Sequence, residues 1–218
     1  MRLYEKYRPQ SLAEVIGHDQ AKSQIQCVLR HGWGGQAFWI SGESGTGKTT
    51  LGRIIAAYGA SDFFIQEYDS ADVVTSEVLT DIEYYMTFGA GGKGGRAYII
   101  NEAHALRGVM VRRLLGILER VPAHVVFVFT TTQRGQKHLF DNQLDAGPLL
   151  SRCIPIELNT FGLTEPFAAR CREIAVAEGL DGLPLASYIR LAQATKQNFR
   201  AMRQAVEAGK MKEQYQDV

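Results

Sequence analysis

The sequence predicts an α/β protein, in which a parallel sheet covered by helices is followed by a small all-α region. Three observations support this prediction. Short apolar segments that are typical of strands alternate with helical segments as far as Leu158, which is the pattern of a parallel sheet. A glycine-rich turn follows the first strand directly. Beyond residue 160 the strand pattern stops, and only helical periodicity continues.

The elements before the glycine-rich turn are short. Residues 4–16 are expected to be irregular up to Pro9 and helical around Leu12–Val15. Residues 19–31 have the pattern of a helix that ends at Gly32. Phe38–Ile40 is apolar and predicts the first buried strand, and residues 51–58 predict the helix that follows the turn.

Four further strands and two intervening helices complete the predicted sheet domain. The strands are expected over residues 63–68, 97–100, 124–129 and 154–158, which gives a five-stranded parallel sheet with helices on both faces. Apolar residues at helical spacing predict helices over 73–86 and 109–121. A polar loop is expected over 133–145. After the sheet, Thr164 can cap a helix closed by Gly179, and two more helices are expected over 183–195 and 198–208.

Composition excludes several classes of protein. The 218 residues are 45% hydrophobic and carry a formal net charge of +1, so a full core is expected and no overall field favours nucleic acid or a membrane. Cys27, Cys153 and Cys171 are scattered, which argues against a zinc site or a disulfide framework and favours a reducing compartment. No apolar run approaches the roughly 20 residues that span a bilayer. We therefore expect a soluble, cytoplasmic protein with no membrane partner.

The glycine-rich turn has the spacing of a phosphate-binding loop. Glycines allow backbone conformations in which successive N–H groups point at one anion, and the next helix directs its positive end at the same anion. Lys48 would reach the β- and γ-phosphates, and the Thr49 hydroxyl would bind Mg²⁺. The alternative is a plain glycine-rich turn. The predicted nucleotide-binding residues of this loop are Gly42, Glu43, Ser44, Gly45, Thr46, Gly47, Lys48, Thr49 and Thr50.

A second polar cluster is expected where other strands end. Asn101 and Glu102 follow the strand over 97–100, which we place beside the first strand, at the sheet edge where ligands of open α/β proteins bind. Glu102 could orient and deprotonate an attacking water, or it could only cap the next helix. Thr132 follows a neighbouring strand and could hydrogen-bond the γ-phosphate or the water, although a threonine-rich strand end is common.

Six short motifs occur in order along the chain. They are Tyr7-Arg8-Pro9, Val15-Ile16-Gly17, the phosphate loop, Asn101-Glu102-Ala103-His104, Leu150-Ser151-Arg152-Cys153 and Asn198-Phe199-Arg200. Together they resemble the clamp-loader group of AAA+ ATPases, and the bacterial motor-subunit branch above all. The likeness extends from residue 3 to about residue 209, and it implies an AAA+ domain over residues 1–160, a helical lid over 161–210 and a polar tail over 211–218.

The resemblance implies roles for individual residues. Thr132 corresponds to the first sensor, and Arg152 to an arginine finger that would reach the ATP of a neighbouring subunit. Arg200 corresponds to a second sensor that contacts the phosphates of its own subunit. Considered without the family, Arg152 and Arg200 are ordinary solvated arginines. The residues that would border the adenine are Arg8, Pro9, Ile16 and Gly17.

One departure from the family concerns the metal. The family has aspartate before the catalytic glutamate, whereas this chain has Asn101, whose amide offers a dipole in place of a full charge. Mg²⁺ binding by Thr49 and Asn101 should therefore be weaker, and hydrolysis could be slow or absent.

The resemblance also implies partners. They are other AAA+ subunits, a sliding clamp and primer-template DNA, for which Arg107, Arg112 and Arg113 are the candidate contacts, although arginines on a polar helix face are usually only solvated. Two alternatives to a hydrolysing loader stay open. They are an ATP-binding assembly switch without turnover and another AAA+ DNA machine, such as a helicase loader or a Holliday-junction motor.

Overall fold

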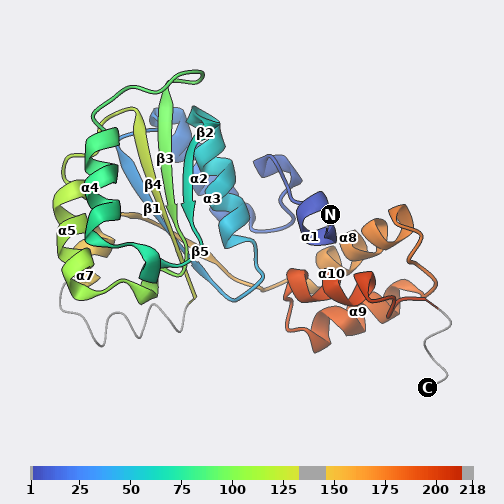
Figure 1. Cartoon of the computed structure of the whole chain (residues 1–218). Helices are drawn as coiled ribbons and strands as arrows, with labels where there is room; N and C mark the ends of the chain where they lie inside the picture. The colour runs from blue at the N-terminus through green and yellow to red at the C-terminus, as the bar shows by residue number, and fades with distance from the viewer. Residues whose placement is uncertain (1, 133–145, 213–218) are drawn as a thin grey trace. The chain divides into compact units, whose positions relative to one another are not determined.

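The structure, a computed structural model, describes residues 2–132 and 146–212 (Figure 1). Contacts between Cα atoms divide the chain into two compact units. We call Asp19–Gly42 with Lys48–Leu158 the sheet unit, and Met1–His18 with Glu43–Gly47 and Asn159–Val218 the helical unit. The polar loop expected over 133–145 lies outside the described residues. The three-part division of the chain at residues 160 and 210 stays a prediction.

The sheet unit contains the predicted five-stranded parallel sheet (Figure 1). Its strand order is β2-β3-β4-β1-β5, and every pairing is parallel. β4 pairs with both β3 and β1, so the expectation that the strand before Asn101 lies beside the first strand was wrong. Proximity in sequence does not fix which strands become neighbours when long crossovers connect them. The strands are β1 (Gln36–Gly42), β2 (Ala60–Tyr68), β3 (Gly95–Ile100), β4 (Val125–Thr131) and β5 (Ile154–Leu158).

Helices cover both faces of this sheet, with α4 and α5 on one face and α2 and α3 on the other (Figure 1). The α4/α5 face holds an aromatic core, in which the ring centroids of Trp39 and Phe129 are 5.7 Å apart and those of Tyr98 and Phe127 are 5.2 Å apart. The helices are α2 (Asp19–His31), α3 (Lys48–Gly59), α4 (Ser76–Tyr85), α5 (Gly108–Leu118) and α7 (Ala146–Ser151), with short 3₁₀ turns η2 (Ala71–Val73) and η3 (Ala103–Ala105).

Some helices begin or end at other residues than the apolar periodicity predicted, because capping residues determine where they start. α4 begins at Ser76, three residues later than expected, because the Thr75 side chain accepts a hydrogen bond from the Val78 N–H at 3.4 Å. The apolar residue Val74 is buried in the core without being helical. α7 was not expected at all, since its six residues include Pro148 and a glycine.

The helical unit contains α1 (Leu3–Lys6), η1 (Leu12–Glu14), α8 (Thr164–Ala177), α9 (Leu185–Ala194) and α10 (Phe199–Glu207). The expectation of an irregular segment before Pro9 was wrong. Leu3 is buried in the core of this unit, and the Arg203 guanidinium donates to the Tyr4 and Tyr7 carbonyls at 3.3 and 3.4 Å. Tertiary contacts thus stabilise a single turn that is too short to form alone.

The caps of the helical unit were predicted in part. Gly179 follows α8 with φ +66°, as expected for a closing glycine. Thr164 does not cap α8, because it is the first helical residue and its hydroxyl accepts a hydrogen bond from the Gln197 side chain at 3.0 Å. Asn198 caps α10 by accepting from the Ala201 N–H at 3.1 Å.

No helix within residues 2–132 and 146–212 is long and apolar enough to cross a membrane.

Candidate nucleotide-binding site

The phosphate-loop lysine and threonine open α3, directly after the loop. Lys48 is the first residue of that helix and is buried. Its ammonium donates to the Gly42 carbonyl at the end of β1 over 3.0 Å. Thr49 and Thr50 follow on the first turn and are half-buried. A buried ammonium beside a helix N-terminus is a strong anion-binding arrangement, because both groups favour negative charge.

The loop residues that lie between Gly42 and Lys48, which are Glu43–Gly47, belong to the helical unit. Gly45 and Gly47 have φ of +78° and +103°, conformations that side-chain-bearing residues rarely adopt. At Gly47 a Cβ would meet no atom within 4 Å, so its backbone alone requires glycine, whereas at Gly45 a Cβ would lie 1.9 Å from the Asn198 amide oxygen. The Thr46 hydroxyl donates to the Glu43 carbonyl at 2.8 Å, and the His18 ring nitrogen lies 3.0 Å from the Thr46 carbonyl. Glu43 and Ser44 are exposed.

Asn101 links the start of α3 to the end of β4. Its side-chain oxygen accepts hydrogen bonds from the Thr49 hydroxyl at 3.1 Å and from the Thr130 hydroxyl at 2.8 Å. Asn101 itself is buried. In the sheet unit Thr49 of the phosphate loop is therefore in direct contact with Asn101, the first residue of the motif Asn101-Glu102-Ala103-His104, which we call the second motif. The predicted metal site requires such a contact.

The sequence did not indicate the residues that contact the nitrogen of the Asn101 side-chain amide, which are Glu67 and, through it, Arg53. The Asn101 side-chain nitrogen donates to the Glu67 carboxylate at 2.9 Å, and Arg53 donates its Nε to the second oxygen of that carboxylate at 2.5 Å. Thr130 was also missed. Glu67 lies near the carboxyl end of β2, and the rule that parallel strands bring these ends to one sheet edge is a signal that could have identified it.

Glu102 has an unusual backbone conformation for a glutamate. Its φ and ψ are +50° and +45°, in the left-handed region. Such conformations cost free energy and concentrate at functional sites. Its carboxylate is 44% exposed and lies 3.5 Å from the His104 Nδ1. The same nitrogen lies 3.2 Å from the Thr131 hydroxyl, and that hydroxyl donates to the Thr132 carbonyl at 3.2 Å. Thr132 follows β4 directly and is half-buried.

The oxygen-rich donor set suits Mg²⁺. The Thr49 hydroxyl, the Asn101 amide oxygen and the Glu102 carboxylate are hard oxygen ligands of the kind that this ion prefers, directly or through water. Within the described residues no group of three or more His, Cys, Asp or Glu side chains could hold a metal by itself. Mg²⁺ that arrives with phosphate and keeps several waters needs only one or two protein ligands.

Arg152, the predicted arginine finger, follows α7. Its guanidinium pairs with Glu119 at 2.5 Å and donates to the Pro148 carbonyl at 3.0 Å. The neighbouring Cys153 is buried, and this burial raises the pKa of its thiol to about 12. The thiol is therefore neutral near pH 7 and adds no counter-charge beside Arg152. Glu119 is the ionic partner of Arg152 in this structure.

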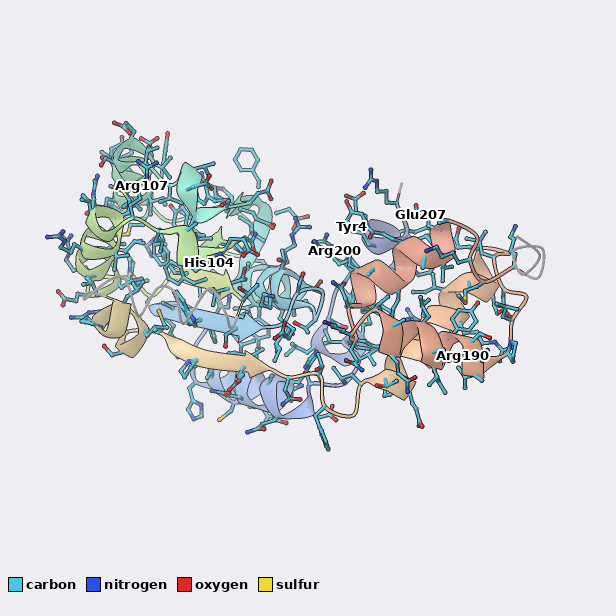
Figure 2. All side chains as sticks on the ribbon, turned by 90° about the horizontal axis from the view of Figure 1, so that it is seen from below. Tyr4, His104, Arg107, Arg190, Arg200 and Glu207 are labelled. Atoms are coloured by element: carbon cyan, nitrogen blue, oxygen red, sulfur yellow. The ribbon has the colours of Figure 1, made fainter. Side chains whose placement is uncertain are left out.

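The remaining predicted nucleotide contacts belong to the helical unit. Arg8, Pro9, Ile16 and Gly17 are half-buried. Arg200 is exposed at the start of α10, and its guanidinium lies 5.9 Å from the centre of the Tyr4 ring. Figure 2 shows these two residues side by side.

Another arginine of α10 has a structural role. Arg203 lies three residues after Arg200 on the same helix. Its burial is the main cause that lowers the pKa of its guanidinium to about 10, and the positive charge of Arg8 is the next cause. Its hydrogen bonds to α1 identify Arg203 as part of the core of the helical unit. The difference in exposure leaves Arg200 as the arginine of α10 that can meet an external anion.

The three DNA candidates differ in their surroundings. Arg107 is exposed and precedes the first residue of α5 (Figure 2). Arg112 is also exposed, on the outer face of α5. Arg113 is engaged within the sheet unit. It pairs with Glu83 at 2.5 Å and donates to the Ser76 carbonyl at 2.6 Å.

Comparisons with known proteins give consistent likenesses. No protein-family model matches the chain. DNA polymerase III subunit gamma/tau of Mycobacterium bovis is 30% identical over 162 residues, which are 61% of this chain and 27% of that protein. DNA polymerase III subunit tau of Salmonella typhimurium is 27% identical over 185 residues, or 75% of this chain and 28% of that protein. A solved structure of RuvB from Thermotoga maritima has a TM-score of 0.72 at 20% identity, covering 92% of this chain and 64% of that one.

The five-stranded parallel sheet, the phosphate loop between β1 and α3, and the helices after β5 define the AAA+ fold. The RuvB likeness supports this fold and nothing finer, since its identity is low. With the gamma/tau likenesses added, the chain is a clamp-loader-like AAA+ protein. It covers only about a quarter of the length of these curated relatives, at 27% and 28%.

Proposed function

We propose that this chain binds and hydrolyses Mg²⁺-ATP as one subunit of a clamp-loader-like AAA+ assembly in DNA replication. The observation that supports this most is the hydrogen bond between the Thr49 hydroxyl and the Asn101 side-chain oxygen. It joins the phosphate loop to the second motif, at the place where both would share a magnesium ion. The proposal divides the chain into a nucleotide-binding domain over residues 1–160 and a lid over 161–210.

Binding would use the loop and its flanks. Lys48 would exchange its bond to the Gly42 carbonyl for the β- and γ-phosphates, and the loop N–H groups would hold the same oxygens. When bound, Mg²⁺ neutralises charge on the phosphates. The resemblance assigns Arg200 to the phosphates as well. It assigns the surroundings of the adenine to Arg8, Pro9, Ile16 and Gly17.

Hydrolysis would use Glu102 as the group that orients and deprotonates the water. Thr132 would hold the γ-phosphate or that water, as the first sensor. Arg152 would leave Glu119 and reach the ATP of a neighbouring subunit, where its charge stabilises the transition state. This division of labour makes turnover depend on assembly with other AAA+ subunits.

Primer-template DNA and a sliding clamp are the proposed partners. Among the DNA candidates the surroundings favour Arg107, which is exposed, over Arg113, whose guanidinium is engaged with Glu83 and α4. Arg112 is also exposed and stays a candidate.

Arg107→Ala and Arg113→Ala form a matched pair that tests this DNA contact. Removing Arg107 should weaken binding of labelled primer-template DNA and reduce the slope of affinity against salt by about 1, since one phosphate contact is lost. Removing Arg113 should leave DNA affinity near that of the native protein and lower stability by about 1 kcal/mol, since its hydrogen bonds to α4 are lost. Fluorescence anisotropy at several salt concentrations, with thermal unfolding beside it, measures both. Equal loss of DNA affinity in the two variants would contradict the assignment.

An assembly switch that binds ATP without turnover is the second candidate. Asn101 favours it, because an amide at this position has no negative charge with which to hold the metal. ATP turnover with and without primer-template DNA separates the two candidates. Turnover that rises with DNA supports the hydrolysing loader. Saturable ATP binding with no turnover under either condition supports the switch.

A further inference from the structure

Asn101 can be oriented in two ways by rotation of its amide, and only one of them serves a metal site. The side chain contacts Thr49 and Thr130 on one side and Glu67 on the other. Hydroxyl groups donate or accept, so the two threonines do not select an orientation. A carboxylate that is paired with an arginine only accepts hydrogen bonds, so the amide nitrogen must face Glu67. The amide oxygen must then face Thr49.

The backbone explains why Glu67 is available for this task. In the β2–β3 pairing Glu67 lies opposite Ile99, two residues before Asn101, so the three side chains share one face of the sheet. Ile99 faces Gly52 of α3, which places that face beneath the helix that begins at Lys48. Arg53 lies one helical turn after Thr49 and donates to Glu67. Three consecutive hydrogen bonds therefore connect Thr49 to Asn101, Asn101 to Glu67, and Glu67 to Arg53. Thr49 and Arg53 belong to the same helix, α3, so both ends of this chain of hydrogen bonds are fixed to one element.

We propose that Glu67 is a positioning residue that holds the Asn101 amide with its oxygen toward Thr49 and the magnesium site. This inference rests on the proposed binding of Mg²⁺-ATP. It explains why an asparagine can serve where the clamp-loader group has an aspartate, because the fixed amide oxygen accepts the threonine hydroxyl bond that a carboxylate would accept.

The first test is a magnesium titration of nucleotide binding, with a fluorescent ATP analogue as the probe. Glu67→Ala should raise the Mg²⁺ concentration at half-effect by about tenfold, as loss of a residue that orients a metal ligand does. Glu67→Gln should shift it less, because its amide oxygen can still accept from Asn101. Affinity for the analogue in chelator, without Mg²⁺, should stay within about twofold of the native value in both variants.

Glu83→Ala is the matched control, since Glu83 is also a carboxylate paired with an arginine in the sheet unit but contacts α5 and not Asn101. Its titration should superimpose on that of the native protein. If the native protein binds the analogue and Glu67→Ala titrates like Glu83→Ala, the inference is overturned and the proposed function stands. If the native protein binds no analogue with or without Mg²⁺, the proposed function fails and this role of Glu67 fails with it.

A second pair of variants decides the question if Glu67→Ala does not fold. Asn101→Asp places a carboxylate where the amide nitrogen now lies 2.9 Å from Glu67, so two like charges would be in contact. Its thermal midpoint without metal should fall by several degrees, and addition of Glu67→Gln should restore it. Equal midpoints for the single and the double variant would overturn the inference.

Discussion

Replacement of Glu102 by glutamine is expected to lower ATP turnover by about 10²- to 10⁴-fold and to leave ATP affinity within a few-fold of the native value. Glutamine has the same length and shape, so the backbone at φ +50° and the contact with His104 can persist. What is lost is a base that can accept a proton from water. Single-turnover phosphate release measures the first quantity, and titration with a fluorescent ATP analogue measures the second.

Glu83→Gln is the control for this prediction, because it neutralises a carboxylate on α4 that pairs with Arg113 and Arg120 rather than with the motif at the end of β3. Its turnover should match that of the native protein. A Glu102→Gln variant with more than a tenth of native turnover would show that another group activates the water. Equal losses of binding and turnover would show that Glu102 supports the fold of the site and not the chemistry.

Replacement of Arg152 by alanine is expected to lower turnover by about 10³- to 10⁵-fold, the usual contribution of an arginine finger. The cause is loss of positive charge at a neighbouring subunit's phosphate, so the defect should be complemented between chains. A mixture of Arg152→Ala with Lys48→Ala should recover part of the turnover. In mixed assemblies some nucleotides are held by an intact Lys48 and contacted by an intact Arg152 from the other chain.

The negative control for complementation is a mixture of Arg152→Ala with the double variant Lys48→Ala and Arg152→Ala, which contains no intact finger. That mixture should remain inactive. If the first mixture is no more active than the second, Arg152 acts within its own subunit or not at all. Native turnover in Arg152→Ala alone would leave Arg152 with a structural role, through its contacts with Glu119 and the Pro148 carbonyl.

Much of the sheet could be predicted from the sequence, since its strands are short, apolar and bounded by turn residues. α2 and β5 have the predicted bounds, and the phosphate loop lies between strand and helix as its mechanism requires. Elements that depend on distant contacts could not be predicted. The turn at Leu3–Lys6 is held by Arg203, which is nearly the whole chain away in sequence. The position of β4 between β1 and β3 is equally a property of the assembled sheet.

The chemistry of the site shows the same division. The motif residues Lys48, Thr49, Asn101 and Glu102 have recognisable spacing, and each was given a role from its motif and side chain. Asn101 was expected to bind Mg²⁺ more weakly than an aspartate would, and the residue that orients its amide was not apparent. Glu67 has no motif of its own, and only the register of β2 against β3 places it beside the amide. Spacing along the chain identifies a site, whereas strand pairing decides what surrounds it.

The most direct test of the central claim is calorimetric titration of the native protein with ATP in excess Mg²⁺, beside the Lys48→Ala variant. Lys48 is a buried charged donor whose loss should cost about 1.5–3 kcal/mol of binding free energy, or roughly a 10- to 100-fold loss of affinity. We predict saturable binding by the native protein and this weaker binding by the variant. The absence of saturable ATP binding by the native protein, or equal affinity in the two proteins, would contradict a nucleotide site at the phosphate loop.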